Sequence, residues 1–188
     1  MPKGCGKQVF IYLLSFQSTA QPGGVHVEYR RDDPNRVLAC ISHPVGILTV
    51  RRGEKINGMT VAWFSQISMN PPMVAVAVSP RRYTWELLKD EDHFGLSLLT
   101  EEQEDICELF GTVSGRSAEK FNMAGIEPFV GEASVPLIPG ALAAGVFKKE
   151  KVIETGDHLL IVGRCIAAYA GEGEPLNWYR SSVRKCRR

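Results

Sequence analysis

The sequence lacks the short motifs that mark several common classes of enzyme. It contains no GxSxG nucleophile motif, no GxGxxG dinucleotide-binding motif and no GxxxxGK[ST] phosphate loop. The five cysteines form no CxxC pair, and no Cys/His cluster has the spacing of a zinc site. We therefore expect neither a Rossmann-type enzyme nor a metal site, whereas a Ser-His-Asp triad, which is assembled in space, is only disfavoured.

The chain also has almost no net charge and no long apolar run. Its 22 Lys and Arg residues nearly balance 21 Asp and Glu residues, so no basic field favours nucleic acid. The apolar run over residues 9–16 is too short to span a membrane, although lysines before it and small residues after it faintly resemble a signal peptide. A membrane partner is not expected, and the cysteines are expected to be reduced thiols in a cytoplasmic protein.

What is present is the composition of one folded domain. Apolar residues make up 44% of the 188 residues and charged residues 23%, the balance of a soluble globular protein. We expect an N-terminal extension over residues 1–24, a single domain over residues 25–180 and a frayed basic tail over residues 181–188.

Strand patterns dominate that domain. Apolar alternation and turn residues predict strands over residues 25–28, 44–52, 56–69, 73–79, 94–100 and, around turns, 135–171. Helices are predicted after Asp33 as N-cap, after Thr84 as N-cap, and after a capping box formed by Thr100 and Gln103. Because strands outnumber helices and are joined by turns, we predict a mainly antiparallel sheet or a small barrel.

Two polar segments flank the apolar stretch of residues 61–78. Before it, "NGMT" offers the side chains of Asn57 and Thr60, while Gly58 would let a ligand or another part of the chain approach the backbone closely. After it, "SPRRYT" joins hydroxyl groups and two guanidinium groups to the start of a helix. That combination predicts a phosphate site, and a solvated strand end with a helix cap is the alternative.

The histidines stand singly, at His26, His43, His93 and His158. His158 differs from the others because it follows Gly156 and Asp157 in a tight turn and opens a strand. A histidine in that position can donate a proton or a hydrogen bond to a ligand, and a purely structural role remains the alternative.

Five segments, taken in order, resemble the flavin reductase-like, split-barrel FMN-binding proteins, which include the flavoredoxins. They are "PVGILTV", the segment "NGMTVAWFSQISMNPPMVAVAVSPRRYTWELLKDEDHFGLSLLT", "GTVSGRSAEKF", "GDHLLIVGRC" and "PLNWYR". The resemblance covers roughly residues 43–179. It implies a mainly β, six-stranded antiparallel Greek-key split barrel with a few peripheral helices, and a homodimer with the flavin near the subunit interface.

The resemblance also implies a role for individual residues. Those expected beside the flavin ring are Asn57, Met59, Thr60, Val61, Ala62 and Trp63. Those expected at the ribityl chain and phosphate are Ser79, Arg81, Arg82, Tyr83 and Thr84, with either arginine as the phosphate ligand. Those expected to close over the ring or the phosphate end are Ser114, Gly115, Lys120 and Phe121. His158 is the expected catalytic residue near the nicotinamide or the flavin face, and Trp178 and Tyr179 belong to an aromatic segment near the site.

The implied function is electron transfer from NADH or NADPH, through bound FMN, to a flavin, a ferric compound or a protein. FAD is the alternative flavin. A flavoredoxin-type electron carrier, which passes electrons between redox protein partners without using NAD(P)H, is the alternative function. A barrel that has lost its flavin is the third reading. The cofactor supplies the redox chemistry in such proteins, so no protein nucleophile is required.

Overall fold

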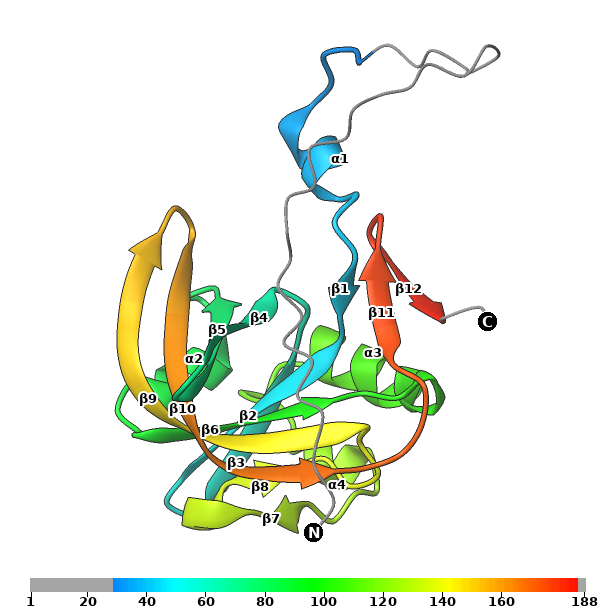
Figure 1. Cartoon of the computed structure of the whole chain (residues 1–188). Helices are drawn as coiled ribbons and strands as arrows, with labels where there is room; N and C mark the ends of the chain where they lie inside the picture. The colour runs from blue at the N-terminus through cyan, green and yellow to red at the C-terminus, as the bar shows by residue number, and fades with distance from the viewer. Residues whose placement is uncertain (1–28, 186–188) are drawn as a thin grey trace, which may run out of the picture. The chain divides into compact units, whose positions relative to one another are not determined.

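The computed structural model describes residues 29–185 of the chain, and Figure 1 shows its mainly antiparallel β architecture. The principal sheet has seven strands in the order β3-β2-β6-β9-β10-β5-β4, all paired antiparallel. Its strands are β2 (Gly46–Arg52), β3 (Lys55–Val61), β4 (Phe64–Met69), β5 (Pro72–Val78), β6 (His93–Leu98), β9 (Ala143–Thr155) and β10 (His158–Ala170). The predicted antiparallel, strand-rich class is confirmed.

Smaller elements surround this sheet. Strands β1 (His43–Pro44), β11 (Leu176–Tyr179) and β12 (Ser182–Lys185) form a three-stranded sheet, and β7 (Phe129–Val130) pairs with β8 (Pro136–Leu137). The helices are α1 (Pro34–Leu38), α2 (Tyr83–Leu88), α3 (Glu104–Thr112) and α4 (Lys120–Met123), with 3-10 turns η1 (Glu101–Gln103) and η2 (Glu132–Ser134). No helix within residues 29–185 combines the length and the apolar character needed to cross a membrane.

A two-residue connection decides the shape of the principal sheet. Strands β3 and β4 follow one another in the sequence with only Ala62 and Trp63 between them, yet they stand at opposite ends of the pairing order. Three Cα–Cα steps span at most about 11 Å. Six strand spacings in a flat sheet would measure about 29 Å. The sheet must therefore curl until its two edge strands approach one another.

The predicted single strand over residues 56–69 was wrong at this connection. The chain leaves β3 at Val61, and the carbonyl of Trp63 then accepts a hydrogen bond from the amide of Ala77 on β5 at 2.8 Å. The apolar alternation continues through the break, so the sequence pattern alone gives no sign that the strand changes its partner here.

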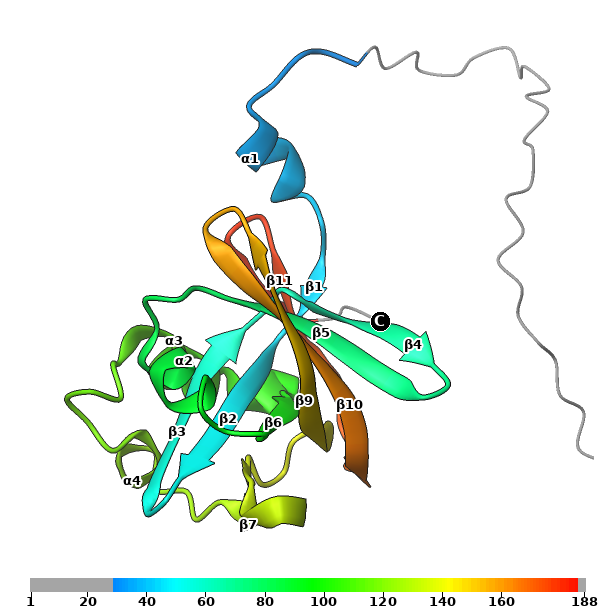
Figure 2. The same cartoon turned by 90° about the vertical axis from the view of Figure 1, so that its left-hand side faces the viewer.

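The hydrophobic core lies on both sides of β2 and β3. One cluster joins the sheet to α2 through Leu48, Val76, Leu88, Phe94 and Ile161, all fully buried. A second cluster joins Ile47 to α3 and α4 and includes Phe110 and Phe121, whose rings meet edge to face at 5.2 Å. Figure 2 shows α2, α3 and α4 gathered beside β2 and β3. These helices carry the loops that build the site described below.

The structure confirms two of the predicted helix caps and contradicts the third. Asp33 caps α1 by accepting from the amide of Asn35 at 2.7 Å, and the capping box of Thr100 and Gln103 is present; both predictions are confirmed. Thr84 is not an N-cap. Helix α2 begins at Tyr83, and the Thr84 hydroxyl is buried and engaged elsewhere.

Two further expectations concern the ends of the chain. The predicted frayed tail instead contains β12, which pairs with β11 through a turn at Arg180 and Ser181. The predicted strand over residues 25–28 lies outside the described residues.

Lys149 fastens the C-terminal end of α2 to the sheet. Its ammonium group donates to the backbone carbonyls of Leu88 and Lys89, each at 2.8 Å. These carbonyls end the helix and have no amide partner of their own within it. Burial lowers the pKa of Lys149, and the nearby Asp92 acts in the opposite direction. Residues 81–84, which precede and open α2, are thereby held to β9 through the helix.

We expect Lys149→Met to destabilise the protein by about 1 kcal/mol, because it keeps the apolar stem but removes the side-chain donor from two carbonyls at the helix end, of which that of Leu88 keeps only the amide of Glu91. Urea unfolding monitored by tryptophan fluorescence measures the change. Lys151→Met is the matched control, since Lys151 lies exposed on the same strand. An equal loss of stability in the two variants would contradict the capping role.

Candidate functional site

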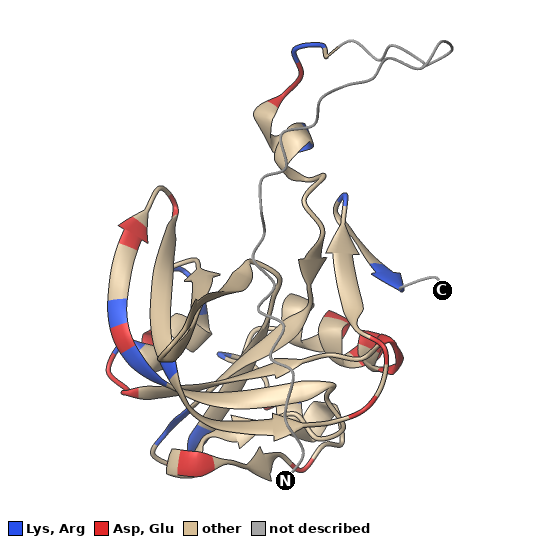
Figure 3. Ribbon diagram, in the orientation of Figure 1, with Lys and Arg blue, Asp and Glu red and all other residues tan. Residues whose placement is uncertain are grey.

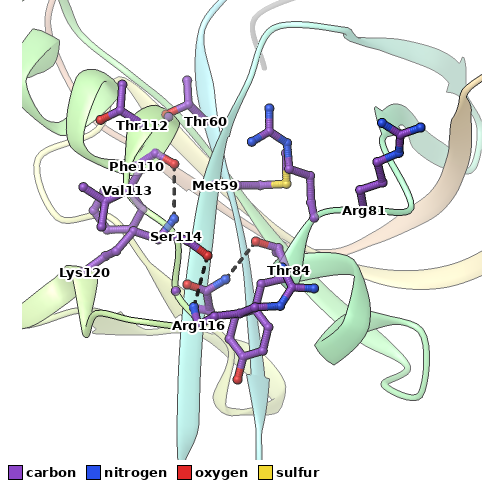
Figure 4. Close-up of a pocket in the computed structure, with 15 residues that line it drawn as sticks. Met59, Thr60, Arg81, Thr84, Phe110, Thr112, Val113, Ser114, Arg116 and Lys120 are labelled. Carbon is purple, nitrogen blue, oxygen red and sulfur yellow. Dashed lines mark hydrogen bonds between the residues drawn. The ribbon is translucent and has the colours of Figure 1, made fainter.

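Two pockets meet beside the carboxyl end of β3. The first, which we call the basic pocket, has a volume of about 520 Å³ and is drawn in Figure 4. The second, the aromatic pocket, has a volume of about 630 Å³. Both are lined by Met59, Thr60 and Arg82, so they adjoin one another, and we call the two together the groove. Both volumes include space that is open to solvent.

The basic pocket is assembled from four segments of the chain. Strand β3 supplies one wall, the residues after β5 supply a second, the end of α3 and its following loop a third, and α4 the last. The lining residues are Asn57, Met59, Thr60, Arg81, Arg82, Tyr83, Thr84, Phe110, Gly111, Thr112, Val113, Ser114, Gly115, Arg116 and Lys120.

Asn57 ties three of these segments together. It is only 4% exposed, and its amide nitrogen donates to the hydroxyl of Thr84 at 2.8 Å (Figure 4). Its carbonyl oxygen lies so close to Gly115 that a Cβ at that glycine would stand 2.2 Å from it. The Asn57 side chain is thus enclosed between the start of α2 and the loop after α3, where it sets the distance between two walls.

Lys120 places a buried cation in this pocket. The residue is 5% exposed, and its ammonium group donates to the carbonyl of Phe110 at 3.2 Å (Figure 4). The group also lies 5.4 Å from the centre of the Phe110 ring. Burial lowers the pKa of Lys120 to about 8, and the positive charge of Arg82 lowers it further in the same direction. Because burial and the charge of Arg82 both disfavour the protonated amine, an anion beside Lys120 would stabilise it.

The two arginines after β5 differ in position. Arg82 lines both pockets, and its charge is the one that acts on Lys120. Arg81 lines the basic pocket alone, and its charge acts on Asp157 at the tip of the β9–β10 turn. Arg82 and Lys120 therefore both line the basic pocket, and Arg82 also lines the aromatic pocket, which Arg81 does not.

The aromatic pocket is built where three strands meet. Trp63 follows β3, Ser79 follows β5 and His158 opens β10, which pairs with β5. The Trp63 and His158 rings stand 4.9 Å apart with their planes tilted by 52°. Trp63 is 53% exposed, so it leaves a large part of its ring available for contact. The other lining residues are Met59, Thr60, Val61, Ala62, Ala77, Arg82 and Trp178.

His158 is held by its neighbour in the turn. Its Nδ1 atom lies 2.8 Å from a carboxylate oxygen of Asp157. The hydrogen bond and the charge of His158 lower the pKa of Asp157. The paired carboxylate fixes the orientation of the ring, which leaves Nε2 as the nitrogen for other partners.

Below the groove, helix α3 anchors β3. The hydroxyl of Thr60 donates to the carbonyl of Cys107 at 2.6 Å. Acidic residues gather at the start of α3 (Figure 3). Burial, together with the charges of Glu104 and Glu108, raises the pKa of Cys107 to about 11. The thiol is protonated at neutral pH and acts as a packed apolar group, not as a nucleophile.

Most of the residues singled out in the sequence lie in this groove. Asn57 lies at the basic end with Thr84, although it was expected beside a ring, and Phe121 is buried in the core against Phe110 and lines neither pocket. Gly58 was expected to allow a close approach by a ligand or by another part of the chain, and the second alternative holds. It faces the core, where a Cβ would stand 2.9 Å from Ile47 and 3.0 Å from Phe110.

Sequence reasoning missed some lining residues, and Arg116 is the most informative of them. The others are Phe110, Gly111, Thr112, Val113 and Ala77. Arg116 stands in the polar segment "GTVSGRSAEKF", where a cation directly after a Ser-Gly pair was the available signal.

The groove suits an elongated ligand that is anionic at one end and flat at the other. Fixed cations and hydroxyl groups at the basic end match a phosphate. Exposed aromatic faces and backbone groups at the aromatic end match a planar ring with polar edges.

Comparisons with known proteins agree with this geometry. Residues 38–187 match the model of the flavin reductase like domain. The reductase component of 4-hydroxyphenylacetate 3-monooxygenase from Thermus thermophilus is 34% identical over 149 residues, which are 79% of this chain and 91% of that protein. An FMN reductase (NADH) of Agrobacterium fabrum is 27% identical, covering 82% of this chain and 83% of that protein.

One further relative is longer than this chain, and another similar protein has a solved structure. An uncharacterized protein of Aeropyrum pernix is 35% identical over 65% of this chain, which spans about half (48%) of that protein's length. The solved structure of an NADH:FAD oxidoreductase from Streptomyces globisporus has a TM-score of 0.78 and 25% identity, covering 86% of this chain and 100% of that one. A family match over residues 38–187, most of the chain, carries the conclusion: this chain belongs to the flavin reductase like domain family.

Proposed function

We propose that this chain is an oxidoreductase that holds FMN in the groove and passes electrons from NADH or NADPH to an acceptor. The observation that carries the proposal is that the basic and aromatic pockets adjoin one another and share Met59, Thr60 and Arg82 as lining residues. A flavin mononucleotide has the same order of parts, with a phosphate, a flexible linker and a planar ring. When bound, the flavin would supply the hydride-accepting chemistry.

The phosphate is assigned to Arg82 and Lys120. Both residues line the basic pocket, and the charge of Arg82 acts on Lys120. A phosphate placed between them relieves their mutual repulsion and gives the buried ammonium group the partner that burial makes favourable. Arg81, Thr84 and Ser114 complete the expected polar surroundings. Because α2 is a short helix of six residues, these side chains, and not the helix dipole, supply most of the attraction.

The flavin ring is assigned to the aromatic pocket. Val61, Ala62 and Trp63 would present backbone groups and one aromatic face to it, and Ser79 lies beside the linker. His158 is assigned as the residue that contacts the reacting region, oriented by Asp157. Trp178 would close the far side, and Tyr179 continues the same strand.

The proposed assembly is a homodimer. Leu38, Ile41 and Trp63 are each at least half exposed and line a wide apolar pocket with Trp178. Both tryptophans also line the aromatic pocket, so a second copy seated there would cover the ring end of the groove. A split barrel formed by the curled sheet, a domain over residues 25–180, a cytoplasmic location and a redox protein as possible acceptor belong to the same proposal.

Anaerobic reduction tests the function. We expect the protein loaded with FMN to lose its yellow absorbance on addition of NADH or NADPH, much faster than free FMN at the same concentration. Flavin that resists both nucleotides but is reduced by dithionite would replace the enzyme with an electron carrier fed by another protein. Failure to bind FMN at all would contradict both the oxidoreductase and the electron carrier.

The affinity for FMN should depend on pH through Lys120. Phosphate binds the protonated amine, whose pKa is about 8 in the free protein. Below that pH the charge is already present; above it, binding must take up a proton, so the dissociation constant should rise by up to about tenfold per pH unit. Flavin fluorescence titrations between pH 7 and 9 measure this dependence.

Riboflavin, which has no phosphate, is the matched ligand and should bind independently of pH over this range. Lys120→Met should weaken FMN binding at pH 7 and abolish the pH dependence. A wild-type profile for FMN that is as flat as that for riboflavin would contradict the assignment of Lys120.

His158→Ala should slow flavin reduction by NADH by roughly tenfold or more, since it removes the oriented donor from the ring end of the groove. FMN should still bind, because the phosphate end is intact. Stopped-flow absorbance under anaerobic conditions separates the two effects. His93→Ala is the control, because His93 lies on β6 outside both pockets. An unaltered reduction rate would make His158 a structural residue.

A further inference from the structure

Lys120 offers a chemistry that the proposed function does not use, because a buried amine is also a nucleophile. The residue is 5% exposed and lines the basic pocket, so its amine is shielded from bulk water but open to whatever the pocket holds. Its hydrogen-bond acceptor is the carbonyl of Phe110, at 3.2 Å (Figure 4). A neutral amine can make this bond as well as an ammonium group can, so the contact does not require the charge.

The surroundings of Lys120 favour the neutral amine. Among the described residues that line the basic pocket, three others are cationic, Arg81, Arg82 and Arg116, and none is an Asp or a Glu. Burial first, and the charge of Arg82 second, lower the pKa of Lys120 to about 8. At pH 7.5 its neutral fraction is therefore on the order of a hundredfold larger than that of an ordinary exposed lysine. Desolvation and a neighbouring cation are two ways in which proteins activate a lysine as a nucleophile.

The same pocket is equipped to bring a small phosphate compound to this amine. Arg82 lines it together with Lys120, and a guanidinium group binds phosphate oxygens in pairs. The hydroxyl of Ser114 accepts from the amide of Arg116 at 3.3 Å and keeps its own hydrogen to donate. A phosphate can thus be bound in this pocket without the charge of Lys120.

We propose that Lys120 is an acylation site: when no flavin occupies the basic pocket, a small acyl phosphate binds there and passes its acyl group to the amine. The inference rests on the phosphate site of the proposed function, since one pocket would hold either phosphate. An acyl phosphate joins the two features that the pocket matches, a dianionic phosphate and, next to it, a carbonyl carbon that an amine can attack.

The transfer balances without any further reactant. The lone pair of Nζ attacks the carbonyl carbon, the bond from that carbon to the bridging oxygen breaks, and inorganic phosphate leaves with the electron pair. The proton lost by the amine passes to the phosphate, and no atom is oxidised or reduced. Arg82 stabilises the negative charge that grows on the leaving phosphate.

The product suits the site better than the free lysine does. An amide is uncharged, so neither burial nor the charge of Arg82 opposes it. Its N–H can still donate to the carbonyl of Phe110. Acylation also removes a cation from the phosphate site and fills part of the pocket, which lowers the affinity for FMN. Bound flavin and acylated Lys120 therefore exclude one another, and acylation is a switch that acts on the flavin-free protein.

The test treats the flavin-free full chain with acetyl phosphate and follows acetylation of each lysine by peptide mass spectrometry. Lys151 is the internal reference, since it lies exposed on β9 and outside the basic pocket. We expect Lys120 to be acetylated about tenfold faster than Lys151, or more. Inorganic phosphate and FMN should each slow the reaction of Lys120, whereas riboflavin, which has no phosphate, should not. None of these additions should change the rate at Lys151.

Two arginine variants separate binding of the acyl phosphate from simple reactivity of the amine. Arg82→Met should slow acetylation of Lys120 by about fivefold or more, because it removes the phosphate ligand and leaves the amine more often protonated. Arg164→Met is the matched control, since Arg164 lies outside the pocket and pairs with Glu150, and it should have no effect. The acetylated protein, and Lys120→Gln as its mimic, should bind FMN about tenfold more weakly than the wild type.

The outcomes distinguish this inference from the proposed function. Acetylation of Lys120 that is no faster than that of Lys151, or that ignores both inorganic phosphate and Arg82→Met, overturns the acylation site. If FMN nevertheless binds and is reduced, the acylation site fails alone. If Lys120 reacts rapidly and phosphate slows it, while FMN neither binds nor protects, the acylation site stands and the proposed function fails.

Discussion

The short connection between β3 and β4 is the constraint on which the rest of the structure depends. Two residues, Ala62 and Trp63, carry the chain from one edge of a seven-stranded sheet to the other. They can do so only because the sheet curls. The same curl brings the end of β3, the end of β5 and the start of β10 to one place, which is where the aromatic pocket forms. The aromatic pocket is therefore a consequence of the curl of the sheet. Trp63 belongs to the connection that requires this curl, and it also lines the pocket.

The basic end of the groove depends on a different kind of interaction. Lys120 is buried beside a second cation, an arrangement that costs free energy in the empty protein. The Phe110 carbonyl offsets only part of this cost, because a neutral acceptor does not cancel the charge. An anion bound beside Lys120, as proposed above, would recover much of the remainder. Asn57 keeps the arrangement from collapsing by holding the start of α2 and the Gly115 turn at a fixed separation.

The sequence predicts the parts of this molecule that depend on local chemistry. Asp33 and the Thr100–Gln103 box follow from side chains that satisfy nearby backbone amides. The break at Ala62 was missed because the apolar pattern runs through it without glycine or proline. Thr84 was misread because its hydroxyl serves Asn57, 27 residues away in the sequence. Strand β12 was missed because Arg180 and Ser181 make its turn in left-handed conformations, which usually select glycine or asparagine. At the site, the polar residues at the ends of the apolar stretch could be recognised from the sequence by their side-chain chemistry. Arg116 could not, because its contacts with Tyr83 and Glu86 exist only in the folded chain.

The two ends of the groove are built from different kinds of structure: mainly strands at the aromatic pocket and mainly loops at the basic pocket. The aromatic pocket is formed by strands and by Ala62 and Trp63, the two residues that connect the edges of the sheet. A substitution in these elements therefore disturbs the hydrophobic core. The basic pocket rests largely on loops, because the residues between β5 and α2 and the segment after α3 form two of its walls. Loops tolerate substitution because few core contacts depend on them. Exposed residues on these loops, such as Arg116, can therefore change without disturbing the strands that line the aromatic pocket. The two pockets can thus vary independently of one another on one scaffold.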